Sequence, residues 1–238
     1  MRMRKKKNGE ARLSACAEFL LGEIEEPMAD PGAHMGKPGA PVYLEIGAGK
    51  GGFACGMAAA HKTVAYFAME KVTDCVVLAA EEAKSREHNL AENLRFIVDT
   101  ADNLLKLFKP GSVDAIFLNF SDPWPKKGYA KRRLTHRRYL SLYMNLLRDG
   151  GILRFKTDNV GLFDFSLEEI EAMALPVDKL TRDLHSSEWN EGNIMTEYET
   201  NFSSQGISIN MLEIHKPAGY TSEISPEFYD REFYKKGV

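Results

Sequence analysis

The stretch LEIGAGKGG, residues 44–52, decides the fold of this chain, because it joins a buried-looking strand to a helix through a glycine-rich turn. Gly47, Gly49 and Gly52 satisfy the GxGxxG spacing, which gives a tight turn and lets a ligand approach the backbone closely. That geometry serves a pyrophosphate and a nucleoside equally well. The stretch therefore predicts a nucleotide-type site at the end of the first strand of an α/β domain.

Segments typical of strands and of helices alternate along the chain after this turn. Such alternation predicts an α/β fold with a doubly wound, mostly parallel, Rossmann-like sheet of seven strands, and the hairpin-like last segments indicate one antiparallel strand. The expected strands cover residues 42–46, 63–69, 94–98, 113–118, 152–156, 179–184 and 208–215. The expected helices cover residues 13–26, 52–60, 74–88, 102–108, 137–147 and 166–174.

Composition divides the chain into three parts. Residues 1–41 hold a basic arm, a helix and a linker at 27–41 that is rich in proline and glycine and should lack regular structure. Residues 42–216 form the α/β domain. Residues 217–238 form an aromatic and charged carboxyl-terminal tail, whose sequence suggests no function.

The positive charge of this chain is concentrated in two short segments, although the net charge is −3. Residues 1–7 carry five cations and residues 126–138 carry seven, with no acid in either segment. The rest of the chain is strongly acidic. Such segregation predicts a basic face that binds a phosphate backbone, although runs of this kind are also common on ordinary solvated surfaces. The cations of the second segment are Lys126, Lys127, Lys131, Arg132, Arg133, Arg137 and Arg138.

The sequence carries no sign of a membrane, a metal or a secretory route. No apolar run approaches the roughly 18–20 residues that span a bilayer. The basic start is followed by polar residues, which is not the pattern of a secretory signal. The three cysteines (Cys16, Cys55 and Cys75) have neither disulfide nor metal-ligand spacing, and the histidines form no helical pair. We therefore expect a reduced, cytoplasmic protein without a metal site.

Acidic residues around the glycine turn narrow the choice of cofactor. Glu45 would crowd a dianionic pyrophosphate but suits a cationic, methionine-like ligand such as S-adenosylmethionine. Glu70 ends the second strand, where a carboxylate binds the two ribose hydroxyls of either cofactor class. At the end of the third strand, Asp99, Thr100 and Asp102 are all candidates to contact an adenine amino group. A nicotinamide-dependent dehydrogenase remains the alternative on the same sheet.

The stretch NFSDPWPKKGYAKRR, residues 119–133, indicates a base-binding loop followed by cations. Asp122 could accept hydrogen bonds from the N–H donors of guanine, and Trp124 offers a face for a base taken out of its stack. The flanking Pro123 and Pro125 fix the backbone. The opposing interpretation is an ordinary Asp-Pro turn beside a core aromatic. The functional interpretation predicts an enzyme that acts on a nucleobase within a polynucleotide.

Two further strings follow later strands. FKTDN at 155–159 places Lys156 and Asp158 at the end of the fifth strand. TEYE at 196–199 has Thr196 as an expected N-cap with Glu199 as its capping-box partner, which explains both residues without a ligand. Tyr198 is either a core residue or a stacking surface.

With these motifs assembled, the chain resembles the bacterial tRNA (guanine-N7-)-methyltransferases from about residue 42 to residue 216. The strings SDPWPKK and KTDN are the most specific to that family. The resemblance implies a methyltransferase domain that transfers methyl from S-adenosylmethionine to N7 of a guanine in the tRNA variable loop. Its partner would be tRNA, and its oligomeric state is left open.

The resemblance also implies roles for individual residues, with Asp122 as the catalytic group. One departure is that the family usually has aspartate where this chain has Thr100. An RNA-binding module without activity is therefore a further alternative. The implied cofactor residues are Glu45, Gly47, Gly49, Gly51, Glu70, Thr100 and Asp122, and the implied substrate residues are Lys126, Asp158, Thr196, Glu197, Tyr198 and Glu199. Arg132, Arg133, Arg137, Arg138 and the amino-terminal cations would hold phosphates.

Overall fold

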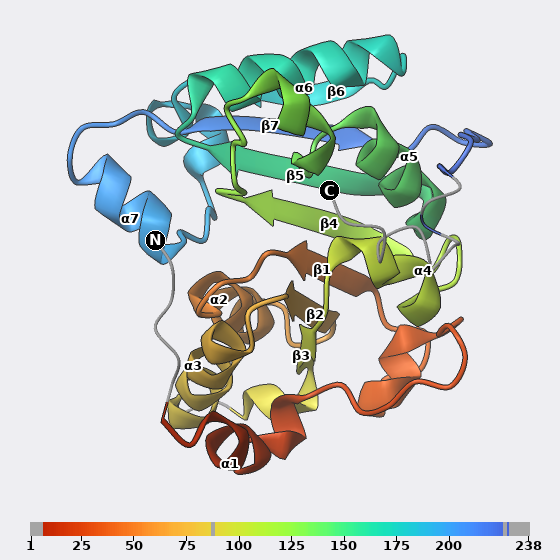
Figure 1. Cartoon of the computed structure of the whole chain (residues 1–238), viewed down its shortest axis with the longest axis vertical. Coiled ribbons are helices and arrows are strands. Elements are labelled where there is room, and N and C mark those ends of the chain that lie inside the picture. Colours follow the sequence, from red (N-terminus) through yellow and green to blue (C-terminus); the bar gives the residue numbers. More distant parts are fainter. Residues whose placement is uncertain (1–6, 87–88, 226–227, 229–238) are drawn as a thin grey trace.

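The computed structural model describes residues 7–86, 89–225 and 228, and its centre is one seven-stranded sheet (Figure 1). The strands lie in the order β3-β2-β1-β4-β5-β7-β6, and β7 runs antiparallel to both of its neighbours. The expected mostly parallel sheet with one antiparallel strand is confirmed. The strands are β1 (Val42–Ile46), β2 (Ala65–Glu70), β3 (Leu94–Val98), β4 (Val113–Asn119), β5 (Leu147–Thr157), β6 (Val177–Thr181) and β7 (Asn210–His215).

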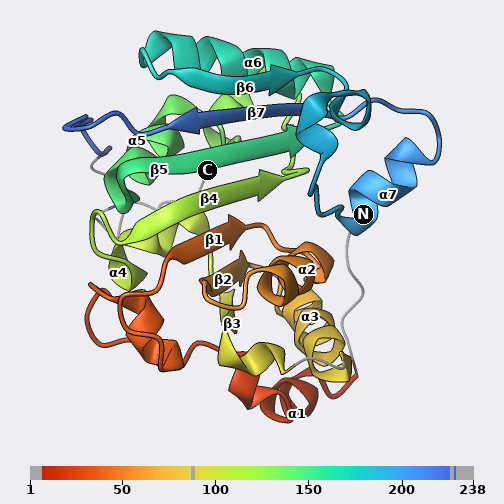
Figure 2. The ribbon, with the colours of Figure 1, turned by 180° about the vertical axis from the view of Figure 1, so that it is seen from behind.

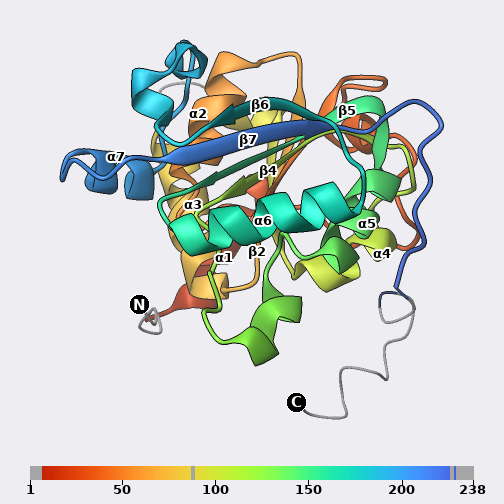
Figure 3. The same cartoon turned by 90° about the horizontal axis from the view of Figure 1, so that it is seen from above.

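Helices cover both faces of the sheet, as Figure 3 shows from above. On β1, Leu44 and Ile46 point into the larger apolar core, while Tyr43 packs against the smaller core on the opposite face. The smaller core takes residues from α2 (Gly52–Ala60) and α3 (Thr73–Ser85). The larger one takes residues from α4 (Leu104–Leu107), α5 (Arg137–Leu146) and α6 (Val160–Ala172). The remaining helices are α1 (Gly9–Ser14) and α7 (Glu197–Ser203).

The amino-terminal segment corrects two predictions. The helix expected over 13–26 is wrong, because α1 ends at Ser14 and the chain continues through a short 3-10 turn into an extended segment. There Leu20 bridges to Phe96, and the amide of Leu21 donates to the Phe96 carbonyl at 2.9 Å. The physical reason is that β3 is an edge strand, whose unpaired backbone groups compete successfully for this segment.

The linker at 27–41 also has more structure than its composition indicated. Pro31–Met35 form a 3-10 helix, and both Met28 and Met35 are buried in the larger core. The amide of Met28 donates to the Leu107 carbonyl at 2.8 Å, and its carbonyl accepts from Lys109 at 2.9 Å. The linker is therefore held to the sheet domain by backbone hydrogen bonds and apolar burial.

Several boundaries differ from expectation, and two of the differences have a local reason. Residues 87 and 88, the end of the helix expected over 74–88, lie outside the described residues. Helix α6 begins at Val160 rather than near residue 166, because the Asn159 side chain caps it by accepting from the Leu162 amide at 2.8 Å. Strand β5 begins at Leu147, because the Gly150–Gly151 pair lies within an irregular part of the strand. Among the described residues, none of the helices is both long and apolar enough to cross a membrane.

We predict that Met28→Ala lowers the free energy of unfolding by about 2–5 kcal/mol, because the shortened side chain leaves a cavity in the larger core. Met195→Ala is the matched control, since Met195 is exposed, and it should change that free energy by less than about 0.5 kcal/mol. Urea unfolding at equilibrium measures both. Equal stability of the two variants would show that residues 27–41 lie outside the cooperative core.

Candidate functional site

The candidate site lies at the carboxyl ends of β2, β1, β4 and β5, which are consecutive in the sheet. Chain order reverses between β1 and β4, and ligands of open α/β sheets bind at such a switch point. Figure 2 shows the arrowheads of β1, β4 and β5 on the side of the sheet where α2 and α7 lie. The turns that follow these strands carry most of the residues expected from the sequence.

The glycines of the first turn serve two different structural purposes. Gly47 and Gly49 have φ of +84° and +55°, and within the described chain no atom lies within 4 Å of a Cβ placed on either. Gly51 also has a positive φ, but a Cβ there would lie 2.7 Å from the Ala79 Cβ. Gly47 and Gly49 therefore leave open space for a ligand, whereas Gly51 lets the turn pack against α3.

Glu45 is a buried carboxylate with one unpaired oxygen. Its side chain is 2% exposed, and Oε1 accepts from Asn119 Nδ2 at 3.0 Å. Among the described residues, no group donates a hydrogen bond to Oε2. Burial raises the pKa of Glu45 to about 7, against the opposing effects of the Asn119 hydrogen bond and the charge of Lys156. A buried acceptor without a partner costs about 1–3 kcal/mol, so a cationic ligand would find this oxygen already desolvated.

Glu70 connects the glycine turn to the start of α3. Its Oε2 accepts from the Gly49 amide at 3.0 Å, and its Oε1 accepts from the Val72 amide at 2.9 Å. The carboxylate is partly exposed at the end of β2. These contacts fix its orientation beside the open face of the glycine turn.

In the turn after β3, the three residues that could contact an adenine make different contacts. Asp102 faces inward: Oδ1 accepts from the Tyr139 hydroxyl at 2.8 Å, and Oδ2 accepts from Thr100 Oγ1 at 3.1 Å. Asp99 Oδ1 accepts from the Thr100 amide and from Asn103 Nδ2, both at 2.7 Å. Asp102 is thus part of the scaffold through these contacts, although all three residues are partly exposed.

Asp122 lies on an irregular loop at the end of β4. Its side chain is 70% exposed, with Lys71 Nζ 4.0 Å away. Phe120 and Trp124 on either side have φ of +52° and +41°, a conformation that costs such residues about 1–3 kcal/mol each. The neighbouring Ser121 Oγ is buried and makes no hydrogen bond within the described part of the chain. A strained backbone, a buried hydroxyl without a hydrogen bond and a largely exposed carboxylate are together typical of a binding loop.

Trp124 lies beside a cation and a second aromatic ring from the segment that follows it. The Arg132 guanidinium lies 5.0 Å from the centre of the Trp124 ring and 4.7 Å from that of Tyr129. Tyr129 itself meets Trp124 edge-on at 5.8 Å. Trp124 thus takes part in an aromatic–cation cluster, so a base that stacks on it must share the ring with these groups.

Three of the arginines expected to hold phosphates instead make contacts within the protein. Arg133 donates to the carbonyls of Pro123 and Trp124 at 3.0 Å each. Arg137 forms a bidentate ion pair with Glu169, at 2.9 Å for both contacts. Arg138 lies 3.6 Å from Asp102 and over the Tyr139 ring. Sequence alone could not pair Arg137 with Glu169 or Arg138 with Asp102, because these partners are distant in the chain. The exposed cations of the segment include Lys126, Lys127, Lys131 and Arg132, and residues 1–6 lie outside the described part.

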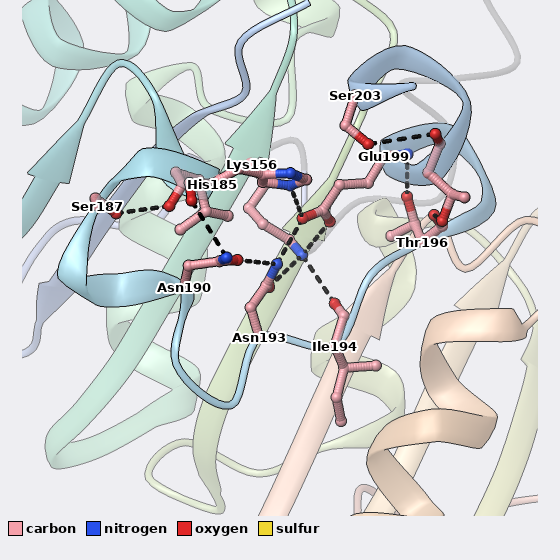
Figure 4. A network of polar contacts seen from close by, with 11 residues as sticks. Lys156, His185, Ser187, Asn190, Asn193, Ile194, Thr196, Glu199 and Ser203 are labelled. Carbon is pink, nitrogen blue, oxygen red and sulfur yellow. Dashed lines mark hydrogen bonds and ion pairs between the residues drawn. The ribbon is translucent and has the colours of Figure 1, made fainter. Parts of the chain in front are cut away.

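A buried ion pair joins the end of β5 to α7 (Figure 4). Lys156 Nζ donates to Glu199 Oε2 at 2.6 Å, and Glu199 Oε1 accepts from Asn193 Nδ2 at 2.6 Å and lies 3.0 Å from His185 Nε2. Glu199 is 0% exposed, so its expected contact with substrate is not direct. Removing one partner of such a pair costs about 3–5 kcal/mol. Asn193 and His185 carried no sequence signal, since they lie far from Lys156 in the chain.

The other residues of the TEYE string and its neighbours face outward to different degrees. Thr196 caps α7 by accepting from the Glu199 amide at 2.9 Å, which confirms the N-cap, but Glu199 itself binds Lys156 and not the cap amide. Glu197 pairs with Lys50 of the glycine turn at 2.7 Å. Tyr198 is 59% exposed and stacks on Phe120, with ring centres 6.3 Å apart. Asp158 is partly exposed at the end of β5, and Lys126 is exposed after the Asp122 loop. The described residues contain no His, Cys, Asp and Glu cluster that could hold a metal.

Solved structures with a similar fold include several methyltransferases. KamB, a 16S rRNA methyltransferase, has a TM-score of 0.55 at 11% identity, and covers 91% of this chain and 97% of that protein. The antibiotic-resistance methyltransferase Kmr has a TM-score of 0.54 at 16% identity, with 84% and 99% covered. A 16S rRNA (adenine-N1)-methyltransferase from Catenulisporales acidiphilia has a TM-score of 0.54 at 13% identity, with 87% and 98% covered. At these identities the likeness concerns the fold.

The family comparison covers most of the chain. The methyltransferase family Methyltransf_4 matches residues 39–212, and it favours methyl transfer over the dehydrogenase alternative. The cofactor is S-adenosylmethionine, and the unpaired Glu45 oxygen and the open backbone of Gly47 and Gly49 fit such a cationic nucleoside ligand. The chain therefore belongs to this methyltransferase family, which is that of the tRNA guanine-N7 methyltransferases.

Proposed function

We propose that this enzyme transfers a methyl group from S-adenosylmethionine to N7 of a guanine in the variable loop of tRNA. One observation carries the proposal: the unpaired oxygen of Glu45 and the exposed carboxylate of Asp122 follow from neighbouring parallel strands, β1 and β4. The carboxylate that would bind the positive end of the cofactor and the loop that would bind the base would thereby lie at one edge of the sheet. The exposed cations after Asp122 suit a phosphate backbone.

The cofactor half of the site is assigned as follows. When bound, S-adenosylmethionine supplies a methyl group activated by its positively charged sulfur. Glu45 would pair with the positive end of the ligand, and Glu70 would accept hydrogen bonds from the ribose hydroxyls. Gly47 and Gly49 would lie against the ligand, with Gly51 shaping the turn behind them. Thr100, next to Asp99, would contact the adenine of the cofactor.

The base half of the site centres on Asp122. N7 of guanine already carries a lone pair, so its methylation removes no proton from the base. What the reaction needs is alignment and a negative charge near the cation that forms on the base. Asp122 would supply both and would also border the cofactor. The tRNA would be contacted by Lys126, Asp158, Thr196, Glu197 and Tyr198. The buried Glu199 would hold its neighbours in place without touching the tRNA.

The test of this function is methyl transfer from labelled S-adenosylmethionine to an unmodified tRNA transcript, followed by nucleoside analysis. We expect N7-methylguanosine, and we expect it to vanish when the variable-loop guanosine is replaced. A different methylated nucleoside would mean that the substrate is wrong. Cofactor binding and tRNA binding without any turnover would instead indicate an RNA-binding module that has lost activity.

We predict that Asp122→Asn lowers kcat on tRNA by about 100-fold or more, because the neutral amide cannot offset the charge that develops on the base. The KM for tRNA should change much less, since Asn keeps the size of Asp and one of its two acceptor oxygens. Asp158→Asn is the comparison, for which we expect the larger effect on KM. Steady-state kinetics on both variants separates the two roles, and nearly intact kcat in Asp122→Asn would exclude an essential charge.

We predict that Glu45→Gln makes the protein without cofactor more stable at pH 8. The folded pKa of about 7 lies above the ordinary 4.5, so the folded state binds more protons than the unfolded state between these values. Wild-type stability therefore falls as pH rises through that window, by on the order of 3 kcal/mol in all, and the Gln variant lacks this loss. Urea unfolding at pH 5 and pH 8 measures the difference, and calorimetry should show weakened S-adenosylmethionine binding. Parallel pH profiles of the two proteins would contradict the prediction.

A further inference from the structure

Residues 193–199 form a strap that crosses the carboxyl-end edge of the sheet from β5 to α2. On the β5 side, Lys156 Nζ donates to Asn193 Oδ1 and to the Ile194 carbonyl, both at 3.1 Å, as well as to Glu199. Figure 4 shows these contacts converging on the one ammonium group. Since an ammonium has three N–H donors, all of the hydrogen-bonding capacity of Lys156 is directed to the strap.

On the other side, the strap lies against the helix that begins at the glycine turn. A Cβ placed on Gly56 of α2 would lie 2.7 Å from Ile194 Cγ2, so the strap sits where only a glycine leaves room. Lys50, within the glycine turn, pairs with Glu197 at 2.7 Å. The same seven residues therefore touch both the cofactor turn and the end of β5.

The buried pair is suited to fixing geometry more than to adding stability. Exchanging a buried ion pair for apolar residues often leaves stability unchanged or higher. In a fully satisfied polar network, however, each group has a single favourable arrangement. Both oxygens of Glu199 are engaged, by Lys156 on one side and by Asn193 and His185 on the other. This arrangement sets the rotation of α7 and leaves Tyr198 exposed beside Phe120.

We propose that Lys156 is a positioning residue: through Glu199 and the Ile194 carbonyl it holds the strap so that Thr196, Glu197 and Tyr198 present one fixed surface to the substrate. Gly56 is the second positioning residue, because it lets the strap lie close to the cofactor turn. The inference rests on the proposed function for the identity of the substrate, but not for the mobility of the strap.

The first test compares Lys156→Met with wild type by amide hydrogen exchange and by kinetics. We expect faster exchange over residues 193–203 with β1 and β4 still protected, and a KM for tRNA raised about 10-fold or more. S-adenosylmethionine affinity should change less than this KM, since Lys156 influences Glu45 only through its charge. Lys179→Met is the matched control, since Lys179 pairs at 2.9 Å with Glu213, another largely buried carboxylate, on β6 and β7. The control should leave the exchange of the strap and the KM unchanged.

The second test avoids the buried charges. Gly56→Ala favours the helical state of α2 but forces Ile194 away, so we expect unimpaired thermal stability together with the same rise in KM for tRNA. Gly9→Ala in α1 is its control, because a Cβ there meets only ordinary contacts at 3.8 Å and beyond. If Lys156→Met does not fold, the KM of Gly56→Ala alone tests whether the position of the strap affects tRNA binding.

Two results would overturn the proposal. One is an unchanged KM for tRNA in the folded variants. The other is an equal loss of affinity for the cofactor and for tRNA, in proportion to a lowered melting temperature, which would indicate general destabilisation. If the wild-type enzyme proves not to methylate tRNA, exchange over residues 193–203 still decides: faster exchange in Lys156→Met supports the strap, and unchanged exchange refutes it. Failure of the proposed function is thereby distinguished from failure of this inference.

Discussion

The parallel pairing of β1 with β4 is the constraint on which the site depends. Leu44, Glu45 and Ile46 lie opposite Ile116, Phe117 and Leu118, so both strands end at the same edge of the sheet. The buried hydrogen bond from Asn119 to Glu45 is a direct result of this register. It joins Asn119, the last residue of β4 and three residues before Asp122, to the carboxylate that we propose binds the cofactor. A one-residue slip would turn Glu45 to the other face of the sheet and separate the two halves of the site.

The parts that sequence could predict are those determined locally or by strand order. The glycine turn and the positions of Glu45, Glu70 and Asp122 follow from short motifs at strand ends. The extended segment around Leu20 could not be predicted, because its conformation is set by a free edge on β3 that lies some seventy residues later in the chain. Likewise, Lys156 and Glu199 are 43 positions apart, and nothing in either motif indicates that they pair.

The basic segment shows how one composition can serve two purposes. Arg133 holds the carbonyls of Pro123 and Trp124, the same stretch in which Phe120 and Trp124 adopt left-handed conformations. A strained loop persists only when its surroundings over-determine it, and Arg133 supplies part of that restraint. The charge available to a phosphate backbone is therefore smaller than the count of seven cations suggests. Lys126, Lys127, Lys131, Arg132 and Arg137 are exposed, although Arg137 is paired with Glu169 and Arg132 lies over two aromatic rings.

Glu45 and Glu199, two of the buried glutamates, differ in a way that separates ligand-binding from scaffold roles. Both sit at the carboxyl-end edge and both are almost inaccessible to solvent. Glu199 has every oxygen engaged by protein donors, and its pKa is lowered by Lys156 despite burial, so it is ionised within a complete network. Glu45 keeps one oxygen without a partner among the described residues, and burial raises its pKa. Leaving this oxygen without a partner lowers the stability of the fold, and a cationic ligand would supply the missing interaction. The asymmetry supports our proposals that Glu45 binds the cofactor and that Glu199 holds the substrate-facing segment in place.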